Sequence, residues 1–298
     1  MREWPPITEP ALLERLAFDR ERFVAFLHEL AGALGRREYE PALLERALGY
    51  PWERPARSYA LRGSDIALLD ELDPAERRAT VHAFAAGRHP IVAFGSNASP
   101  ATLTAKFAHF PDAEDRRVLV LAGALHGLDV GASASPTAYG AMPAALFASP
   151  GTAVRAAVLW LTAEQVTQLT WSEISYRLGQ LDGAHFEMDE VDIEVDGLFA
   201  YVSRFGALCI DGAPVALAAI PATGRTARAL TQRELLDAVA AMVVAPDAHA
   251  EDLVRAIFED MAGVLARVPT AVWPSARPLP PQLWTPFPAS GRPDPDAG

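Results

Sequence analysis

The sequence predicts an α+β protein in which a small mixed β-barrel carries added helices at both ends. Two observations lead to this fold class. Between Pro90 and Ile220, short β-type runs follow one another with turns and few long helices between them. On both sides of this region, apolar residues recur every three or four positions, which is typical of helices. We therefore divide the chain into an N-terminal helical extension (1–89), a central barrel domain (90–225), and C-terminal helices with a Pro-rich tail (226–298).

The N-terminal extension contains three predicted helices. Thr8 can cap the first, which continues through apolar residues at three-and-four spacing as far as Leu34 and stops at Gly35. A shorter helix covers 42–48, and residues 52–64 form a connection. Asp73 and Pro74 then open a helix that closes near residue 87. These helices carry no chemical signature, so we expect them to serve packing.

Eight short runs in the central region predict strands: 91–94, 118–125, 144–147, 153–161, 191–195, 199–202, 208–210 and 215–220. Asp211-Gly212 lies between the last two runs and is a strong hairpin signal. Two helices are predicted beyond the barrel, over 231–245 and 249–268, the first opening with a capping box. Residues 291–298 have too little apolar surface to fold and are predicted to be disordered.

The composition excludes several classes of function. A net charge of −12 opposes binding to phosphate backbones and anionic membranes, so neither nucleic acid nor a membrane is expected as a partner. No signal peptide or membrane span is evident. The single cysteine, Cys209, lies in an apolar run and fits a small core residue in a reducing cytoplasm. The seven histidines lack metal-ligand spacing, so no metal or cofactor is expected.

The most informative stretch is an apolar strand, Ile91–Phe94, that runs into Gly95-Ser96-Asn97. This pattern is typical of a buried strand ending in a tight turn whose backbone N–H groups face a ligand. Asn97 is the only asparagine in a chain whose bias towards arginine indicates a GC-rich genome, which favours a functional role. The alternative is an ordinary strand-end turn with asparagine in a left-handed conformation.

A second informative stretch runs from Thr162 to Tyr176. Thr162 and Gln165 predict a capping box, and the helix after it places Val166, Leu169, Glu173 and Tyr176 on one face. Because the apolar members must face inward, Glu173 should too, and loss of solvation there favours a carboxyl that can both accept and donate a proton. The alternatives are an exposed glutamate at a frayed helix end and a pair with Arg177.

Together these residues resemble the γ-glutamylcyclotransferase-like superfamily over Pro90 to Ile220. The resemblance lies in the strand ending in Phe94-Gly95-Ser96-Asn97, the strand 154–161 and the Leu169-x-x-x-Glu173 pattern. The segments 123–127 and 142–146 also fit two further strands of that family.

The resemblance implies a cofactor-independent enzyme. The α-amine of a γ-glutamyl amide, or of a related small amino-acid amide, closes onto its own γ-carbonyl, giving 5-oxoproline and a free amine. Glu173 would be the catalytic general acid and base, and the amides of Gly95, Ser96 and Asn97 would hold substrate oxygens. Phe94 and Tyr176 would complete the substrate-binding wall.

Three residues depart from the family pattern. Phe94 replaces the usual tyrosine, Thr170 replaces a frequent aspartate, and Ala145 replaces the family's threonine. These changes keep open a second hypothesis, a non-catalytic module that binds a small molecule or another protein on the same fold. Outside the resemblance, Lys106 is expected on the surface of the helix after Asn97, with contact to an anion as the alternative. The acidic run 182–196 is expected to be a solvated strand face, with a cation site as the alternative.

Overall fold

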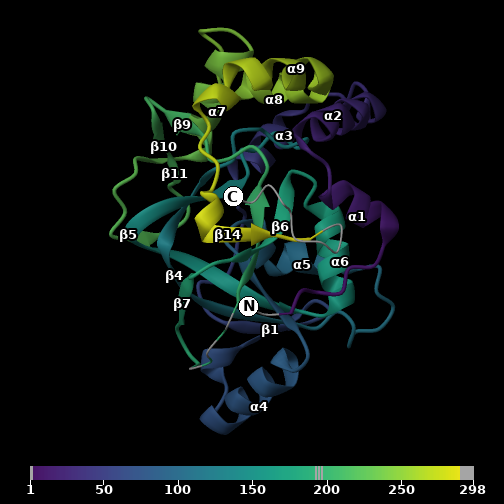
Figure 1. Ribbon diagram of the computed structural model, residues 1–298, viewed down its shortest axis with the longest axis vertical. Helices are drawn as coiled ribbons and strands as arrows, with labels where there is room; N and C mark the ends of the chain where they lie inside the picture. Colours follow the sequence, from purple (N-terminus) through teal and green to yellow (C-terminus); the bar gives the residue numbers. More distant parts are fainter. Residues whose placement is uncertain (1–2, 192, 194, 196, 289–298) are drawn as a thin grey trace.

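A large mixed sheet forms the centre of the protein in a computed structural model that describes residues 3–191, 193, 195 and 197–288. The strands are β1 Tyr59–Arg62, β2 Asp65–Leu68, β3 His89–Ala93, β4 Val118–Ala132, β5 Ala144–Leu161, β6 Tyr176–Leu181, β7 His185–Met188, β8 Phe199–Ser203, β9 Cys209–Ile210, β10 Ala213–Pro214, β11 Ala216–Leu217, β12 Ala222–Thr223, β13 Ala229–Leu230 and β14 Trp284–Pro286. Most of these strands belong to one sheet with the order β13-β11-β4-β5-β3-β8-β6-β14 (Figure 1).

Helices cover this sheet at several places. They are α1 Pro10–Leu16, α2 Arg20–Leu34, α3 Pro41–Leu48, α4 Pro74–Ala85, α5 Pro100–Lys106, α6 Ala163–Ser172, α7 Gln232–Val243, α8 Ala250–Glu259 and α9 Met261–Ala271, with short 3-10 turns at Leu69–Glu71, Ser96–Ala98, Trp273–Ser275 and Pro281–Leu283. The prediction of an α+β protein is therefore confirmed. The strand pairings of the described residues do not show closure into a barrel, so the barrel stays a prediction.

The sheet is mixed because two of its pairings are parallel. β3 runs parallel to β8 and antiparallel to β5, and β11 runs parallel to β13. The longest pairing joins β4 and β5, and its register shifts between His126 and Leu128. The strands predicted to end at 125 and to break at 148–152 are continuous, because Gly127 and Gly151 take positive φ angles that let the chain bend without leaving the sheet.

Two further strand predictions have different outcomes. Asp211 and Gly212 have φ angles of 54° and 78°, as the predicted primed turn requires, and they join β9 to β10. The predicted strand 191–195 is wrong, since Val191, Ile193 and Val195 lie outside any strand and pack instead against the core. Asp192, Glu194 and Asp196 lie outside the described residues, as does the predicted disordered segment 291–298.

The two terminal regions meet on one side of the molecule. α2 packs against α9, and α3 packs against α7 and α8 (Figure 1). One helix was predicted where α1 and α2 lie, and one where α8 and α9 lie, but α1 and α2 are separated at Asp19 and α8 and α9 at Asp260. The side chains of these aspartates accept hydrogen bonds from Arg22 N and Gly263 N, so each starts a new helix.

The terminal regions also contribute strands. β1 lies in the predicted connection 52–64 and pairs with β2 and β4, and β14 pairs with β6. The N-terminal extension is thus not helical throughout, and both additions extend the same sheet.

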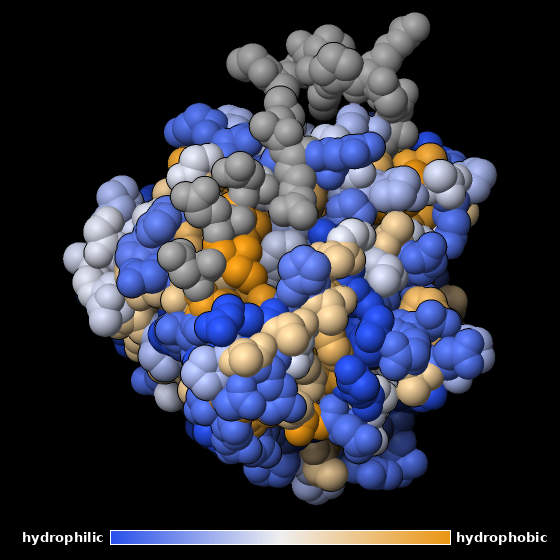
Figure 2. All heavy atoms as spheres, turned by 90° about the horizontal axis from the view of Figure 1, so that it is seen from below, coloured by the Kyte–Doolittle hydropathy of each residue, from blue (hydrophilic) through white to orange (hydrophobic). Residues whose placement is uncertain are grey.

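Alternation along β3 divides the core between the two faces of the sheet. Ile91 and Ala93 pack in one buried cluster with α5 and α6, whereas Val92 and Phe94 pack in another with α2, α7 and α9. The face seen in Figure 2 is largely hydrophilic with smaller apolar areas. Within the described part of the chain, no helix is long and apolar enough to cross a membrane.

Candidate functional site

The turn after β3 brings the backbone close to a side chain of the N-terminal extension. β3 ends at Ala93, a 3-10 turn covers Ser96–Ala98, and α5 follows. A Cβ added to Gly95 would lie 2.6 Å from the hydroxyl oxygen of Tyr50 and 3.1 Å from the Cβ of Ala144. Glycine is therefore required here because Tyr50 fills the space beside the turn, not because of an unusual φ angle.

Glu173 lies at the end of a helix rather than inside one. The capping box of Thr162 and Gln165 is confirmed, but α6 ends at Ser172 and Glu173 is its C-terminal cap. The predicted continuation to Tyr176 is wrong, because Glu173 leaves helical geometry (φ −91°, ψ 56°) and Tyr176 pairs with Ser203 as the first residue of β6. Helical periodicity could not reveal that a strand would take over.

The carboxylate of Glu173 meets the only asparagine and the only lysine of the chain. Its Oε1 accepts a hydrogen bond from Asn97 Nδ2 at 3.0 Å and one from Lys106 Nζ at 2.7 Å. Lys106 Nζ also donates to Asn97 Oδ1 at 2.7 Å, which closes a ring of three contacts. The expectation that Lys106 lies on the surface is thus wrong, since its side chain is 20% exposed and that of Glu173 13%.

Both alternatives for Glu173 are also wrong. Its side chain is mostly buried, and the arginine that follows in the sequence, Arg177, donates to Phe18 O at 2.8 Å instead. Arg15 of α1 holds the end of α6 by donating to the carbonyl oxygens of Thr170 and of Trp171, the latter at 3.0 Å. A cation that binds the last carbonyls of a helix stabilises that end, so the N-terminal extension fixes the position of Glu173.

Two tyrosine hydroxyls contact the backbone of Ala144, the first residue of β5. Ala144 N–H donates to Tyr50 Oη at 2.9 Å, and Tyr176 Oη donates to Ala144 O at 2.7 Å. Burial raises the pKa of Tyr50 to about 12, against the lowering effect of backbone hydrogen bonds from Ala144 and Ser96. Burial also raises the pKa of Tyr176, with a further rise from the charge of Glu173. Both phenols therefore keep their protons at neutral pH.

Phe94 and Thr170, two of the residues that depart from the pattern of the resembling family, are both buried. Phe94 has no hydroxyl and packs in the core, and its carbonyl accepts from Arg54 at 3.3 Å. Thr170 Oγ1 lies 2.9 Å from Tyr201 Oη and donates to Val166 O at 2.7 Å. Thr170 is thus engaged with Tyr201 and with its own helix. The phenol that enters the turn region comes from Tyr50.

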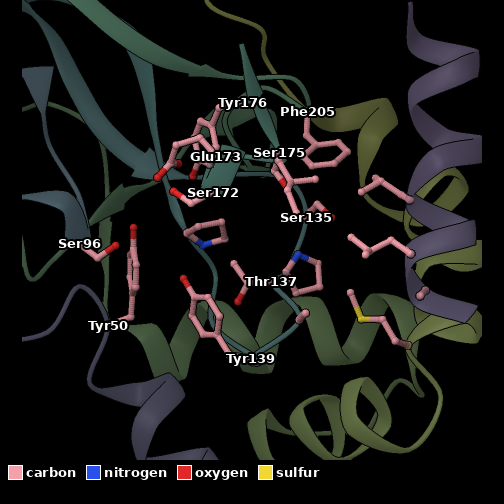
Figure 3. A pocket seen from close by; sticks show the side chains of 18 of the residues that line it. Tyr50, Ser96, Ser135, Thr137, Tyr139, Ser172, Glu173, Ser175, Tyr176 and Phe205 are labelled. Atoms are coloured by element: carbon pink, nitrogen blue, oxygen red, sulfur yellow. The ribbon is translucent and has the colours of Figure 1, made fainter. Parts of the chain in front are cut away.

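The predicted site residues line two adjoining hollows, together with Tyr50 and Lys106. The smaller, of ≈ 40 Å³, is lined by the predicted site residues Phe94, Gly95, Ser96, Asn97, Glu173 and Tyr176 together with Tyr50, Val92, Ala93, Ala144 and Tyr201. The larger, of ≈ 340 Å³, shares Tyr50, Ser96, Glu173 and Tyr176 with it and adds Lys106 and Tyr139. Figure 3 shows the labelled polar side chains around this larger cavity. The predicted convergence of the turn and the glutamate is therefore observed.

Two residues of the site, Tyr50 and Lys106, were missed by sequence reasoning. A signal existed for Lys106, because a lone lysine among 26 basic residues is as unusual as the lone asparagine. For Tyr50 the sequence offered none, since it lies in a segment between two elements and reaches the site only through the tertiary fold.

The structure also bears on metal binding and on the single cysteine. No group of three or more His, Cys, Asp or Glu side chains in the described ranges could hold a metal ion. Cys209 is buried and free, as expected for a core residue, and burial raises the pKa of its thiol.

Comparison of the chain with protein-family models, curated proteins and solved structures found no match.

Proposed function

We propose that the chain is a cofactor-independent γ-glutamylcyclotransferase-like enzyme. It would convert a γ-glutamyl amide, or a related small amino-acid amide, to 5-oxoproline and release an amine. In this proposal the large sheet corresponds to the β-barrel of that family, and the two terminal regions are additions to it. The observation that carries the proposal is the ion pair of Lys106 and Glu173, which is bound to Asn97 and lines the cavity.

This ion pair is complementary in charge to the head group of an amino acid. A γ-glutamyl amide carries an α-ammonium and an α-carboxylate at neutral pH. Glu173 can bind the ammonium and Lys106 the carboxylate, so the pair exchanges one partner for another without leaving a charge alone in a mostly buried site. Asn97 supports both forms, because its amide offers a donor to Glu173 and an acceptor to Lys106.

The reaction that follows needs only a proton carrier and a folded substrate. Glu173 accepts a proton from the α-ammonium, and the free amine attacks the γ-carbonyl carbon to form the ring C–N bond. The amide C–N bond then breaks as Glu173 returns the proton to the leaving amine. The ring nitrogen gives up its second proton, which Glu173 passes to the released amine, so that 5-oxoproline and an ammonium ion are the products. General acid–base catalysis of this kind contributes about 10²–10⁴-fold, and holding the two ends of one molecule together supplies the rest.

The smaller hollow suits the oxygen that becomes negative in the transition state. Its volume of ≈ 40 Å³ is about that of one water molecule. The Tyr50 oxygen accepts the Ala144 N–H, so the hydroxyl proton of Tyr50 remains for an oxyanion. Tyr50 would thereby replace the phenol that is missing at Phe94.

A second candidate is a module that binds the same head group without reaction. The observation that favours it is the contact of Lys106 Nζ with Glu173 Oε1 at 2.7 Å, because an ion pair of this kind can hold a charged head group without transferring a proton. Binding of γ-glutamyl amides and of 5-oxoproline, followed by thermal shift, without release of 5-oxoproline would support this candidate over the enzyme.

The decisive experiment is the substitution Glu173→Gln with Glu164→Gln as its matched control. Both residues belong to the α6 region, but Glu164 is exposed in the first turn of the helix. We expect Glu173→Gln to lower the release of 5-oxoproline from γ-glutamyl amides by at least 10²-fold and Glu164→Gln to leave it unchanged. Full turnover by Glu173→Gln would remove the assigned role.

A further inference from the structure

The larger cavity has two chemically different ends. One end carries Glu173, Ser96 and Tyr50. The other lies against α2 and α9, on the side of Phe205 in Figure 3. Lys106 and Glu173 are the only charged side chains that line this cavity in the described part of the chain. If both bind the head group of a substrate, no charged group is left for the rest of that molecule.

The apolar end is built from one face of each of two helices. On α2 the lining residues follow helical spacing, and on α9 they lie four positions apart, so each set faces the cavity together. These residues are Leu27, Leu30, Ala31 and Leu34 of α2 and Met261 and Leu265 of α9. Leu34 is 39% exposed and is therefore the most accessible part of this wall.

We propose that the amine released by this enzyme carries an extended apolar group that lies between α2 and α9. The inference rests on the proposed function and names the substrate class within it. A volume of ≈ 340 Å³ is in the range of pockets that bind small organic molecules, and a γ-glutamyl head alone would leave the apolar end to water. An aliphatic or arylalkyl group displaces that water favourably.

The same argument disfavours an amino acid or peptide as the leaving amine. Such a group would bring a second carboxylate into the cavity, where the single cationic partner, Lys106, is already needed by the α-carboxylate. Burying a carboxylate without a partner is strongly unfavourable. The two terminal regions thus have a defined task, because each supplies one helix to the wall that selects the amine.

Binding of inert analogues tests this inference separately from the reaction. In these analogues a sulfonyl group replaces the γ-carbonyl, so no ring can close, and the sulfonamide nitrogen carries methyl, hexyl or carboxymethyl. With the full native chain, calorimetry should show the hexyl analogue binding more tightly than the methyl analogue by about fourfold for each methylene that the cavity covers. The carboxymethyl analogue should bind more weakly than the methyl one.

Two variants locate the effect. We expect Leu34→Glu to lower the ratio of hexyl to methyl affinity at least tenfold, because it places a charge in the apolar wall. Ala31→Phe, which fills the wall instead, should lower the same ratio. The matched control is Met242→Glu on α7, whose side chain is equally exposed but does not line the cavity, and its ratio should equal that of the native chain.

The outcomes separate the two proposals. Equal affinity for the hexyl and methyl analogues, tighter binding of the carboxymethyl analogue, or an unchanged ratio in both wall variants would overturn the apolar-amine inference. If the hexyl analogue binds tightly as expected but the native chain releases no 5-oxoproline from γ-glutamyl hexylamide, the apolar pocket is supported and the proposed reaction fails.

Discussion

The ion pairs Arg225–Asp129 and Lys106–Glu173 are both largely buried, yet their surroundings differ. Asp129 of β4 is fully buried and accepts two hydrogen bonds from Arg225, at 2.8 and 2.7 Å, and one from Val130 N–H at 2.8 Å. Glu173 also has a basic partner, but both of its described contacts are made by Oε1, which leaves Oε2 available to a ligand. Both carboxylate oxygens of Asp129 are therefore engaged by the protein, whereas only one oxygen of Glu173 is.

This difference separates a structural ion pair from one that can exchange partners. Arg225 also donates to Ile220 O at 2.9 Å and so ties the loop after β12 to β4. Lys106 and Glu173, by contrast, line a cavity and lie at the ends of two short helices, α5 and α6. A buried ion pair in which the protein binds both carboxylate oxygens has a structural role, and one that faces a cavity with a free carboxylate oxygen is a candidate for ligand binding.

We expect the largest effect when the structural ion pair of Arg225 and Asp129 is broken. Arg225→Met leaves the carboxylate of Asp129 buried without a cation, and such a loss typically lowers the free energy of unfolding by about 3–5 kcal/mol. Urea or guanidinium unfolding measures it. The control is Arg155→Met, since Arg155 and Asp189 form a pair with side chains 35% and 36% exposed, for which at most about 1 kcal/mol is expected. Equal effects of the two variants would contradict the distinction.

The next effect concerns the exchangeable pair. Lys106→Met removes the proposed partner of the substrate carboxylate, a hydrogen bond between charged groups worth about 1.5–3 kcal/mol. We expect KM for γ-glutamyl amides to rise about 10–100-fold with little change in kcat, because the contact is equal in the ground and transition states. Steady-state release of 5-oxoproline measures both constants, with Arg116→Met as control, because Arg116 lines neither hollow. A fall in kcat at constant KM would assign Lys106 to the chemical step instead.

A third test concerns Gly95, in the turn that carries Asn97, one of the two partners of Glu173. Gly95→Ala should lower the free energy of unfolding by about 1–3 kcal/mol, since its Cβ would meet Tyr50 Oη at 2.6 Å. Without that oxygen the nearest ring atom is 3.7 Å away, so the same substitution in a Tyr50→Phe background should cost less. Chemical unfolding of the single and double variants gives the coupling free energy. A coupling of zero would mean that Tyr50 does not restrict this position.

A site residue could be predicted from the sequence where a local pattern determines its position, and not where a contact between distant segments does. The capping box before Glu173 was recognised because its hydrogen bonds form within three residues. The strand into Gly95-Ser96-Asn97 was recognised because an apolar run ends directly in turn residues. The α+β class followed in the same way from periodicity. Local patterns also explain the errors, since helical spacing continued past Ser172 where β6 pairing decides the conformation.

The rest of the site was beyond local reasoning. Tyr50 reaches Ala144 across 94 residues, and Arg15 reaches Thr170 across 155. Strand β1 could not be predicted from its four residues, because its pairing with β4 supplies the hydrogen bonds that make it a strand. Contacts of this kind depend on the packing of whole elements, and composition offers a clue only when a residue type is as rare as Lys106.

The smallest effect is a pH dependence, and it tests whether the turn holds a neutral phenol. Folding raises the pKa of Tyr50 from 10 to about 12, chiefly through burial. The native state therefore retains a proton that the unfolded chain releases, so the stabilisation is complete below pH 10 and is lost as the pH rises towards 12. Each pH unit in this window should lower the free energy of unfolding by about 1.4 kcal/mol through this group. We therefore expect the free energy of unfolding, measured between pH 10 and 12, to fall less per pH unit in Tyr50→Phe than in the native chain. The buried Tyr59 also titrates from a raised pKa, so Tyr59→Phe gives the matched comparison, and an unchanged slope in Tyr50→Phe would mean that the turn tolerates a phenolate.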